Sequence, residues 1–266
     1  SMNQCTDQIV LALLPPERIA SVTWLSRDPG GSLMAAEARR VGVNHGLAEE
    51  VLEQKPDLVI AGAFTTPALR GMLKRLGYPL VEVSHAGSIE DIRTVTRQIA
   101  AAVGEPARGE AMIGRMDAAL KRLAADAEAN GKSRSVPVVA WDSSGFAAGE
   151  GTLYDAILNA AGARNLVRDP MTVSYRKPDA EVLLQADPVL LVEGSIDTAA
   201  TSLGDEAIKH RVVRRYWGTR TVRIPQSYYV CGTPMIADAA VQLRDDLRAA
   251  VKGTPNAPLP WARWSS

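Results

Sequence analysis

Six aromatic side chains stand where predicted β-strands end, although aromatic residues make up only 5% of the chain. They are Trp24, Phe64, Trp141, Phe146, Tyr228 and Tyr229. An aromatic residue at a strand end can simply cap a hydrophobic core. However, the carboxyl ends of parallel strands gather at one edge of a sheet, where ligands bind. Six aromatic residues at such an edge favour a ligand-lining role for several of them. Broad aromatic faces suit a large, partly apolar ligand, such as a macrocycle or an aromatic chelate.

Two polar side chains accompany these aromatic residues. Arg27 lies three positions after Trp24, so its guanidinium is a candidate clamp for a carboxylate or an anionic chelate. A surface ion pair with Asp28 explains Arg27 equally well. His85 follows another predicted strand and is a candidate to bind a metal or to hydrogen-bond a ligand, although a lone histidine is more often a plain loop residue. His45 lies in an ordinary helix or loop context and is a weaker candidate, as is the third histidine of the chain.

The familiar motifs of catalysis are missing from the sequence. It contains no Walker A motif, no GxGxxG after a first strand, no GxSxG elbow and no HExxH. The glycine-rich segment 145–151 precedes a predicted helix, but its spacing fits no phosphate-binding motif well. No nucleophile has a base poised beside it. We therefore expect a binding protein and not an enzyme, with no catalytic residue, no cofactor and no metal ion held by the protein itself.

Charge and cysteine content narrow the partners further. The 266 residues include 30 basic and 30 acidic side chains, so the formal net charge is zero. This balance gives no electrostatic reason to expect nucleic acid or an anionic membrane surface as a partner. Cys5 and Cys231 belong to no CxxC or His/Cys cluster, which argues against structural zinc. They either form one disulfide, which requires an oxidising compartment, or remain two separate buried thiols.

The two halves of the chain repeat one pattern of elements. Residues 50–62 and 181–194 each read as a helix end, a proline-marked turn and a short apolar strand. Short apolar strands between helices are typical of parallel sheets covered on both faces. Between the halves, residues 106–130 predict one helix of about 37 Å. The expected fold is therefore α/β, with two Rossmann-like lobes, each with a mainly parallel sheet, joined by one long rigid helix.

The same patterns predict the individual elements and the domain boundaries. Strands are expected at residues 18–24, 58–61, 80–83, 136–141, 189–192 and 221–224. Other helices are expected at residues 6–13, 33–41, 47–54, 67–76, 89–103, 153–161, 180–185, 205–214 and 234–251, with Thr6 or Asp7 capping the first. The expected parts are an N-terminal lobe (1–104), a connecting helix (105–131) and a C-terminal lobe (132–266).

Several segments, in this order and spacing, carry a resemblance to a known family. Residues 18–29 look like its second strand and the loop that follows, and residues 43–52 with 55–59 look like its E-x-(I/V)-L…PDLV signature. Residues 149–154 with 161–165 look like the start of its second lobe. Together they resemble the cluster A (class III) periplasmic substrate-binding proteins of ABC importers, the family that serves iron–siderophores, haem and cobalamin.

The resemblance implies a shallow cleft between two lobes, no enzymatic activity, export to the periplasm and delivery of the ligand to an ABC permease at the inner membrane. We therefore expect a monomeric carrier of a metal chelate, either a ferric siderophore or cobalamin. Haem is an alternative, with His85, Tyr228 or Tyr229 as its axial ligand. A lipid or sterol carrier on the same scaffold is another. A chelatase-like enzyme is the third, and it would need a catalytic His/Glu pair.

Overall fold

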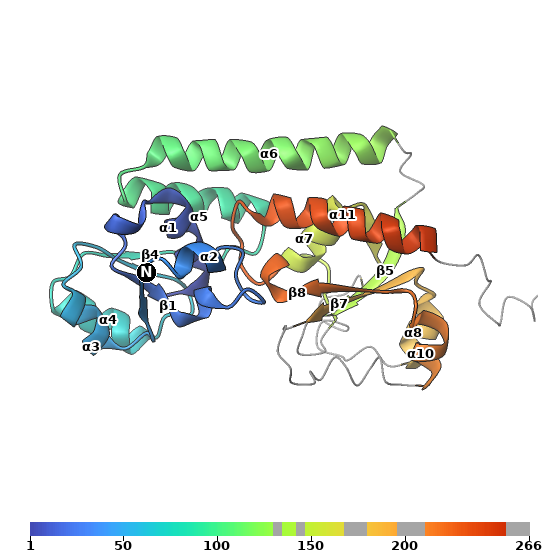
Figure 1. Cartoon of the computed structure of the whole chain (residues 1–266), viewed down its shortest axis with the longest axis horizontal. Helices are drawn as coiled ribbons and strands as arrows, with labels where there is room; N and C mark the ends of the chain where they lie inside the picture. The colour runs from blue at the N-terminus through green and yellow to red at the C-terminus, as the bar shows by residue number, and fades with distance from the viewer. Residues whose placement is uncertain (130–134, 142–146, 168–179, 196–210, 254–266) are drawn as a thin grey trace, which may run out of the picture. The chain divides into compact units, whose positions relative to one another are not determined.

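The computed structural model describes residues 1–129, 135–141, 147–167, 180–195 and 211–253 (Figure 1). Phe146 and the first part of the helix predicted at 205–214 lie outside these residues. Within them, no helix is both long enough and apolar enough to cross a membrane. All strand pairs between named strands are parallel and helices separate the strands along the chain, so the predicted α/β fold class is confirmed.

The chain forms two compact units, and each is interrupted in sequence. The first consists of Ser1–Arg122 and Gln226–Ala239, and the second of Leu123–Pro225 and Ala240–Ser266. The long predicted helix is present as α6 (Pro106–Ala129), and it carries the chain from the first unit into the second. The predicted division into lobes at residues 104 and 131 stays a prediction. By their contacts, residues 226–239 join the first unit.

The first unit contains two separate two-stranded sheets, β1–β2 and β3–β4 (Figure 1). Its elements are α1 (Gln4–Leu13), β1 (Ser21–Thr23), α2 (Ala35–Ala38), β2 (Gly42–Asn44), α3 (Ala48–Gln54), β3 (Val59–Ala61), α4 (Pro67–Arg75), β4 (Leu80–Glu82) and α5 (Ile89–Ala102). The first two residues connect the sheets. The Ser1 amine donates to the Ser21 carbonyl (3.0 Å), and the Met2 N–H donates to the Ile60 carbonyl (2.9 Å). A hollow of about 690 Å³ is lined by residues of β1, β3 and α1.

One strand and one helix predicted for this unit are shorter in the structure than the sequence pattern indicates. The strand predicted at 18–24 is only β1, and a 3₁₀ turn, η2 (Trp24–Arg27), follows it directly. The helix predicted at 33–41 shrinks to α2, and β2 was not predicted at all. The N-cap of α1 is Asn3 and not Thr6 or Asp7, because the Asn3 side chain accepts hydrogen bonds from the first backbone N–H groups of the helix.

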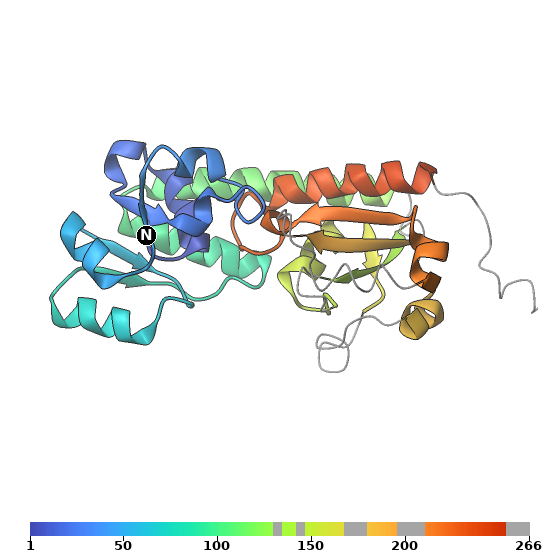
Figure 2. The same ribbon diagram turned by 60° about the horizontal axis from the view of Figure 1, so that its bottom comes forward.

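Helix α5 is well defined by its own sequence and packs beside α6. Ser88 and Asp91 form a reciprocal capping box at its start. Arg93 on α5 makes an ion pair with Asp117 on α6 (2.8 Å), and Figures 1 and 2 show the two helices side by side.

The second unit is built on one four-stranded parallel sheet in the order β6-β5-β7-β8 (Figure 2). Its elements are β5 (Val136–Trp141), α7 (Leu153–Ala160), β6 (Ala163–Asn165), α8 (Ala180–Ala186), β7 (Leu190–Ser195), α10 (Arg211–Trp217), β8 (Thr221–Pro225) and most of α11 (Ile236–Gly253). The 3₁₀ turn η4 (Gln226–Tyr228), which follows β8, and the start of α11 belong to the first unit. A core cluster joins β5 and β7 to α8 and α10, with Leu183, Leu191 and Trp217 fully buried. The Trp217 indole also donates to the Pro188 carbonyl (2.8 Å).

Candidate functional site

In the first unit, the carboxyl ends of β1, β2 and β3 surround a hollow of about 300 Å³. The N-terminal residues of α1 and Val230 complete its lining. Its aromatic and imidazole side chains are those of Trp24, His45 and Phe64. Trp24 is 53% exposed and Phe64 is 75% exposed, which is unusual for large aromatic side chains. The strand ends of this unit therefore present an open, partly aromatic surface.

Asp7 places Trp24 at this surface. The Asp7 carboxylate is buried in α1, and its Oδ2 accepts three hydrogen bonds, from the Thr23 N–H (2.9 Å), the Thr23 hydroxyl (2.5 Å) and the Ser26 hydroxyl (2.8 Å). These bonds end β1 at Thr23 and fold the next residues into the 3₁₀ turn. Trp24 thus leaves the strand and is exposed instead of entering the core.

His45 is fixed by its neighbours in the loop between β2 and α3. The Glu50 carboxylate on α3 accepts hydrogen bonds from the His45 backbone N–H (2.6 Å) and from the ring atom Nδ1 (2.7 Å). Asn44 is buried, and its amide donates to the Ser1 carbonyl and to the Ser21 hydroxyl, while its oxygen accepts from the Gly46 N–H. Gly46 has a positive φ of 77°, a conformation that glycine adopts without strain.

The bonds from His45 also change the electrostatics of Glu50. The backbone N–H of His45 lowers the pKa of the Glu50 carboxyl, and the imidazole adds to the effect. Glu50 is therefore ionised at neutral pH.

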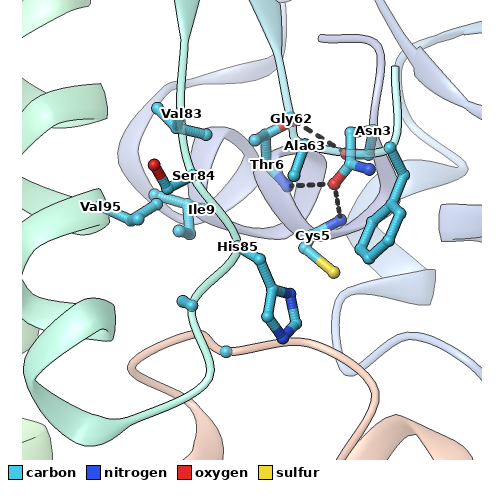
Figure 3. A pocket seen from close by; sticks show the side chains of 13 residues that line it. Asn3, Cys5, Thr6, Ile9, Gly62, Ala63, Val83, Ser84, His85 and Val95 are labelled. Atoms are coloured by element: carbon cyan, nitrogen blue, oxygen red, sulfur yellow. Dashed lines mark hydrogen bonds between the residues drawn. The ribbon is translucent and has the colours of Figure 1, made fainter. Parts of the chain in front are cut away.

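Phe64 and His85 both line a second, much smaller hollow of about 20 Å³, which has room for about one water molecule. Figure 3 shows His85 at this hollow. The rings of Phe64 and His85 lie edge to face, with centroids 5.7 Å apart. Figure 3 shows Asn3 at this hollow, where it accepts hydrogen bonds from the backbone of Cys5 and Thr6. Gly62 permits this approach, since a Cβ there would lie 2.6 Å from the Asn3 side chain.

Cys5 and Cys231 form a disulfide in the structure, with Cα atoms 5.0 Å apart. The bond ties α1 to the segment after β8, and within the same unit the Ser227 N–H of that segment also donates to the Gly30 carbonyl (2.7 Å). Val230, next to Cys231, lines the larger hollow. The disulfide therefore holds one part of the site lining in place.

The structure brings only some of the predicted site residues together. Trp24 and Phe64 share the larger hollow, and His85 contacts Phe64. Arg27 does not line either hollow; its guanidinium donates to the carbonyls of Ala38 (3.2 Å) and Val41 (2.7 Å) at the end of α2. These bonds explain Arg27 without a ligand.

The aromatic residues of the later half behave differently. Trp141 is fully buried in a core cluster with residues of β7, α8 and α10 and lines neither hollow, so its role at a ligand site stays a prediction. Tyr228 is half-buried and Tyr229 is buried, and neither is part of the lining of the two hollows. Phe146 lies outside the described residues.

The sequence makes His45 a weaker candidate than His85, whereas in the structure His45 lines the larger hollow. The missed signal was the short strand β2, because a histidine that directly follows a parallel strand lies at the same sheet edge as Trp24 and Phe64. Within the described residues, no three His, Cys, Asp or Glu side chains gather closely enough to hold a metal ion.

Solved structures with this fold include periplasmic binding proteins of several organisms. The periplasmic heme-binding protein RhuT from Roseiflexus sp. RS-1, in apo form, is 21% identical with a TM-score of 0.76, and the match covers 94% of this chain and 97% of that one. A periplasmic heme-binding protein from Pseudomonas aeruginosa is 22% identical with a TM-score of 0.74, covering 97% and 93%. The vitamin B12-binding protein BtuF of Vibrio cholerae is 18% identical with a TM-score of 0.66, covering 94% and 96%. At these identities the likeness shows the fold.

No curated protein sequence matches the chain significantly. A family model does, and it agrees with the resemblance seen in the sequence segments. The model described as periplasmic binding protein matches residues 1–224, and the chain belongs to that family.

Proposed function

We propose that this protein captures a metal chelate in the periplasm and delivers it to an ABC permease, as a monomer and without catalysis. The observation that carries the proposal is the pair of exposed aromatic side chains, Trp24 and Phe64, at one hollow of about 300 Å³. Exposed apolar surface of this kind is costly in water and marks a ligand or partner site. Family membership and the periplasmic location of the structural neighbours support the carrier role.

Among the metal chelates considered, a tetrapyrrole-type macrocycle such as cobalamin or haem fits this surface better than an anionic ferric siderophore. The larger hollow is lined by aromatic, aliphatic, amide and imidazole groups, and no lysine or arginine is part of that lining in the described residues. Arg27, the candidate clamp for an anion, is bonded to backbone carbonyls. The printed names of the neighbours include heme-binding and vitamin B12-binding proteins, which points the same way.

Calorimetric titration of the purified protein tests the proposal. The probes are hemin, cyanocobalamin, one ferric catecholate and one ferric hydroxamate siderophore. We expect one-to-one binding of a tetrapyrrole with a Kd of about 1 μM or tighter, and weaker binding in Trp24→Ala. Leu76→Ala is the matched control, because Leu76 is exposed in the same unit and lines neither hollow. Absence of heat and of fluorescence change with all four probes would refute the proposal.

A further inference from the structure

His45 has the hydrogen-bonding pattern of a histidine prepared to bind a metal. An ionised carboxylate can only accept hydrogen bonds, so the Nδ1 atom that lies 2.7 Å from Glu50 must carry the proton. In the neutral ring the other nitrogen, Nε2, then bears the lone pair. No described residue forms a hydrogen bond with Nε2. Carboxylate–histidine–metal arrangements use the same order of contacts to fix the ring and to make the ligating nitrogen more basic.

His45 also lies where a bound ligand could reach its ring. Its side chain is 57% exposed, and it lines the same hollow as Trp24 and Phe64. Glu50 holds the ring at Nδ1 and also accepts a hydrogen bond from the His45 backbone N–H, so part of the conformational freedom of this residue is already lost before a ligand binds.

One histidine alone does not hold a bare cation, and the described residues contain no cluster of three ligating side chains. A single imidazole suits a metal that arrives with its other ligands supplied by a chelator. A tetrapyrrole is such a chelator, since it occupies four positions around the metal and leaves axial positions open.

We propose that Nε2 of His45 is the axial ligand that this protein offers to the metal of a bound tetrapyrrole, with Glu50 as the residue that positions the ring. The inference rests on the proposed function. On binding, the Nε2 lone pair forms the bond to the metal, and the water or anion at that axial position leaves. The oxidation state of the metal does not change.

His85 is the competing histidine, and its contacts favour it less. Its ring packs edge to face on Phe64, and it is part of the lining of the 20 Å³ hollow but not of the 300 Å³ hollow. No described carboxylate forms a hydrogen bond with its ring. His85→Ala is therefore the matched control for His45→Ala.

Absorption and electron paramagnetic resonance spectra of the full chain test the inference. The probes are ferric hemin and aquocobinamide, a corrinoid without its own nucleotide base. We expect a shifted absorption band in the unaltered protein and in His85→Ala, and loss of that shift in His45→Ala with binding at least about 10-fold weaker. Free imidazole at millimolar concentration should restore the shift in His45→Ala. Glu50→Gln should keep the shift but weaken binding by up to about 10-fold.

The outcomes separate the two proposals. If His45→Ala binds either probe with an unchanged spectrum, His45 is not the ligand, although the protein remains a tetrapyrrole carrier. If the shift disappears only in His85→Ala, the ligand is His85 and the inference falls. If calorimetry shows that neither probe binds the unaltered protein, the inference fails, and the proposed function fails with it only when cyanocobalamin and the two siderophores also give no heat.

Discussion

Replacing Phe64 by alanine should weaken ligand binding strongly and leave the fold almost unchanged. Phe64 is 75% exposed in the free protein, so its removal creates no cavity in the core. A phenylalanine has about 150–250 Å² of surface, so roughly 150 Å² of this one faces water. A chelate that covers half of this exposed area removes roughly 75 Å² from solvent. At about 25 cal/mol per Å² this contributes roughly 2 kcal/mol, or about 25-fold in Kd.

The assay compares calorimetric Kd values of Phe64→Ala and the unaltered protein for the tetrapyrrole that binds. Urea unfolding of both proteins should give free energies within about 0.5 kcal/mol of one another, as expected for a surface substitution. Leu76→Ala removes a side chain that is 53% exposed in the same unit and should change neither quantity. An unchanged Kd in Phe64→Ala would show that the exposed ring does not contact the ligand, and the argument from exposed aromatic surface would be lost.

Three further outcomes concern stability, each measured by urea or thermal unfolding. Asp7→Ala should lower the free energy of unfolding by about 3 kcal/mol, because three buried donors lose a charged acceptor. A free energy of unfolding equal to that of the unaltered protein would refute the role given to this carboxylate. Burial raises the folded-state pKa of Asp187 above 3.8, so its ionisation destabilises the fold as the pH rises. Asp187→Asn should thus be more stable at about pH 7, by no more than about 0.5 kcal/mol because solvent screens this exposed group, and equal at about pH 3. Replacing both Cys5 and Cys231 by serine should cost about 3–5 kcal/mol, since the bond closes a loop across 226 positions, and an unchanged midpoint would contradict this.

Elements with a strong local pattern could be predicted from the sequence. The helix expected at 89–103 has a capping box at Ser88 and a regular apolar stripe, and it is present as α5. The long helix expected from residue 106 is present as α6. Short apolar strands such as β3 and β7 were also located correctly. In each case the information lies within a few turns or within one short run of residues, so no distant contact is needed to decide the structure.

Elements that depend on tertiary contacts were predicted less well. The helix expected at 33–41 ends early because Arg27 bonds the carbonyls of Ala38 and Val41, and the chain after it pairs with β1 as β2. The sequence pattern contains neither the arginine contact nor the strand partner. The position of His45 at the larger hollow was missed for the same reason, since it depends on β2 and on a hydrogen bond to a side chain of the next helix.

The two tryptophans that end similar strands show what decides between a core residue and a site residue. Residues 22–24 and 139–141 both run from valine through one intervening residue to tryptophan, and the valine and tryptophan favour a strand in each. Trp141 continues in β5, pairs in register with Glu193 on β7 and is fully buried. Trp24 is exposed because Asp7, 16 positions before Thr23, accepts the Thr23 N–H and turns the chain out of the strand. A single buried carboxylate on α1 thus places Trp24 at the surface, and the three residues Val22 to Trp24 do not by themselves predict this exposure.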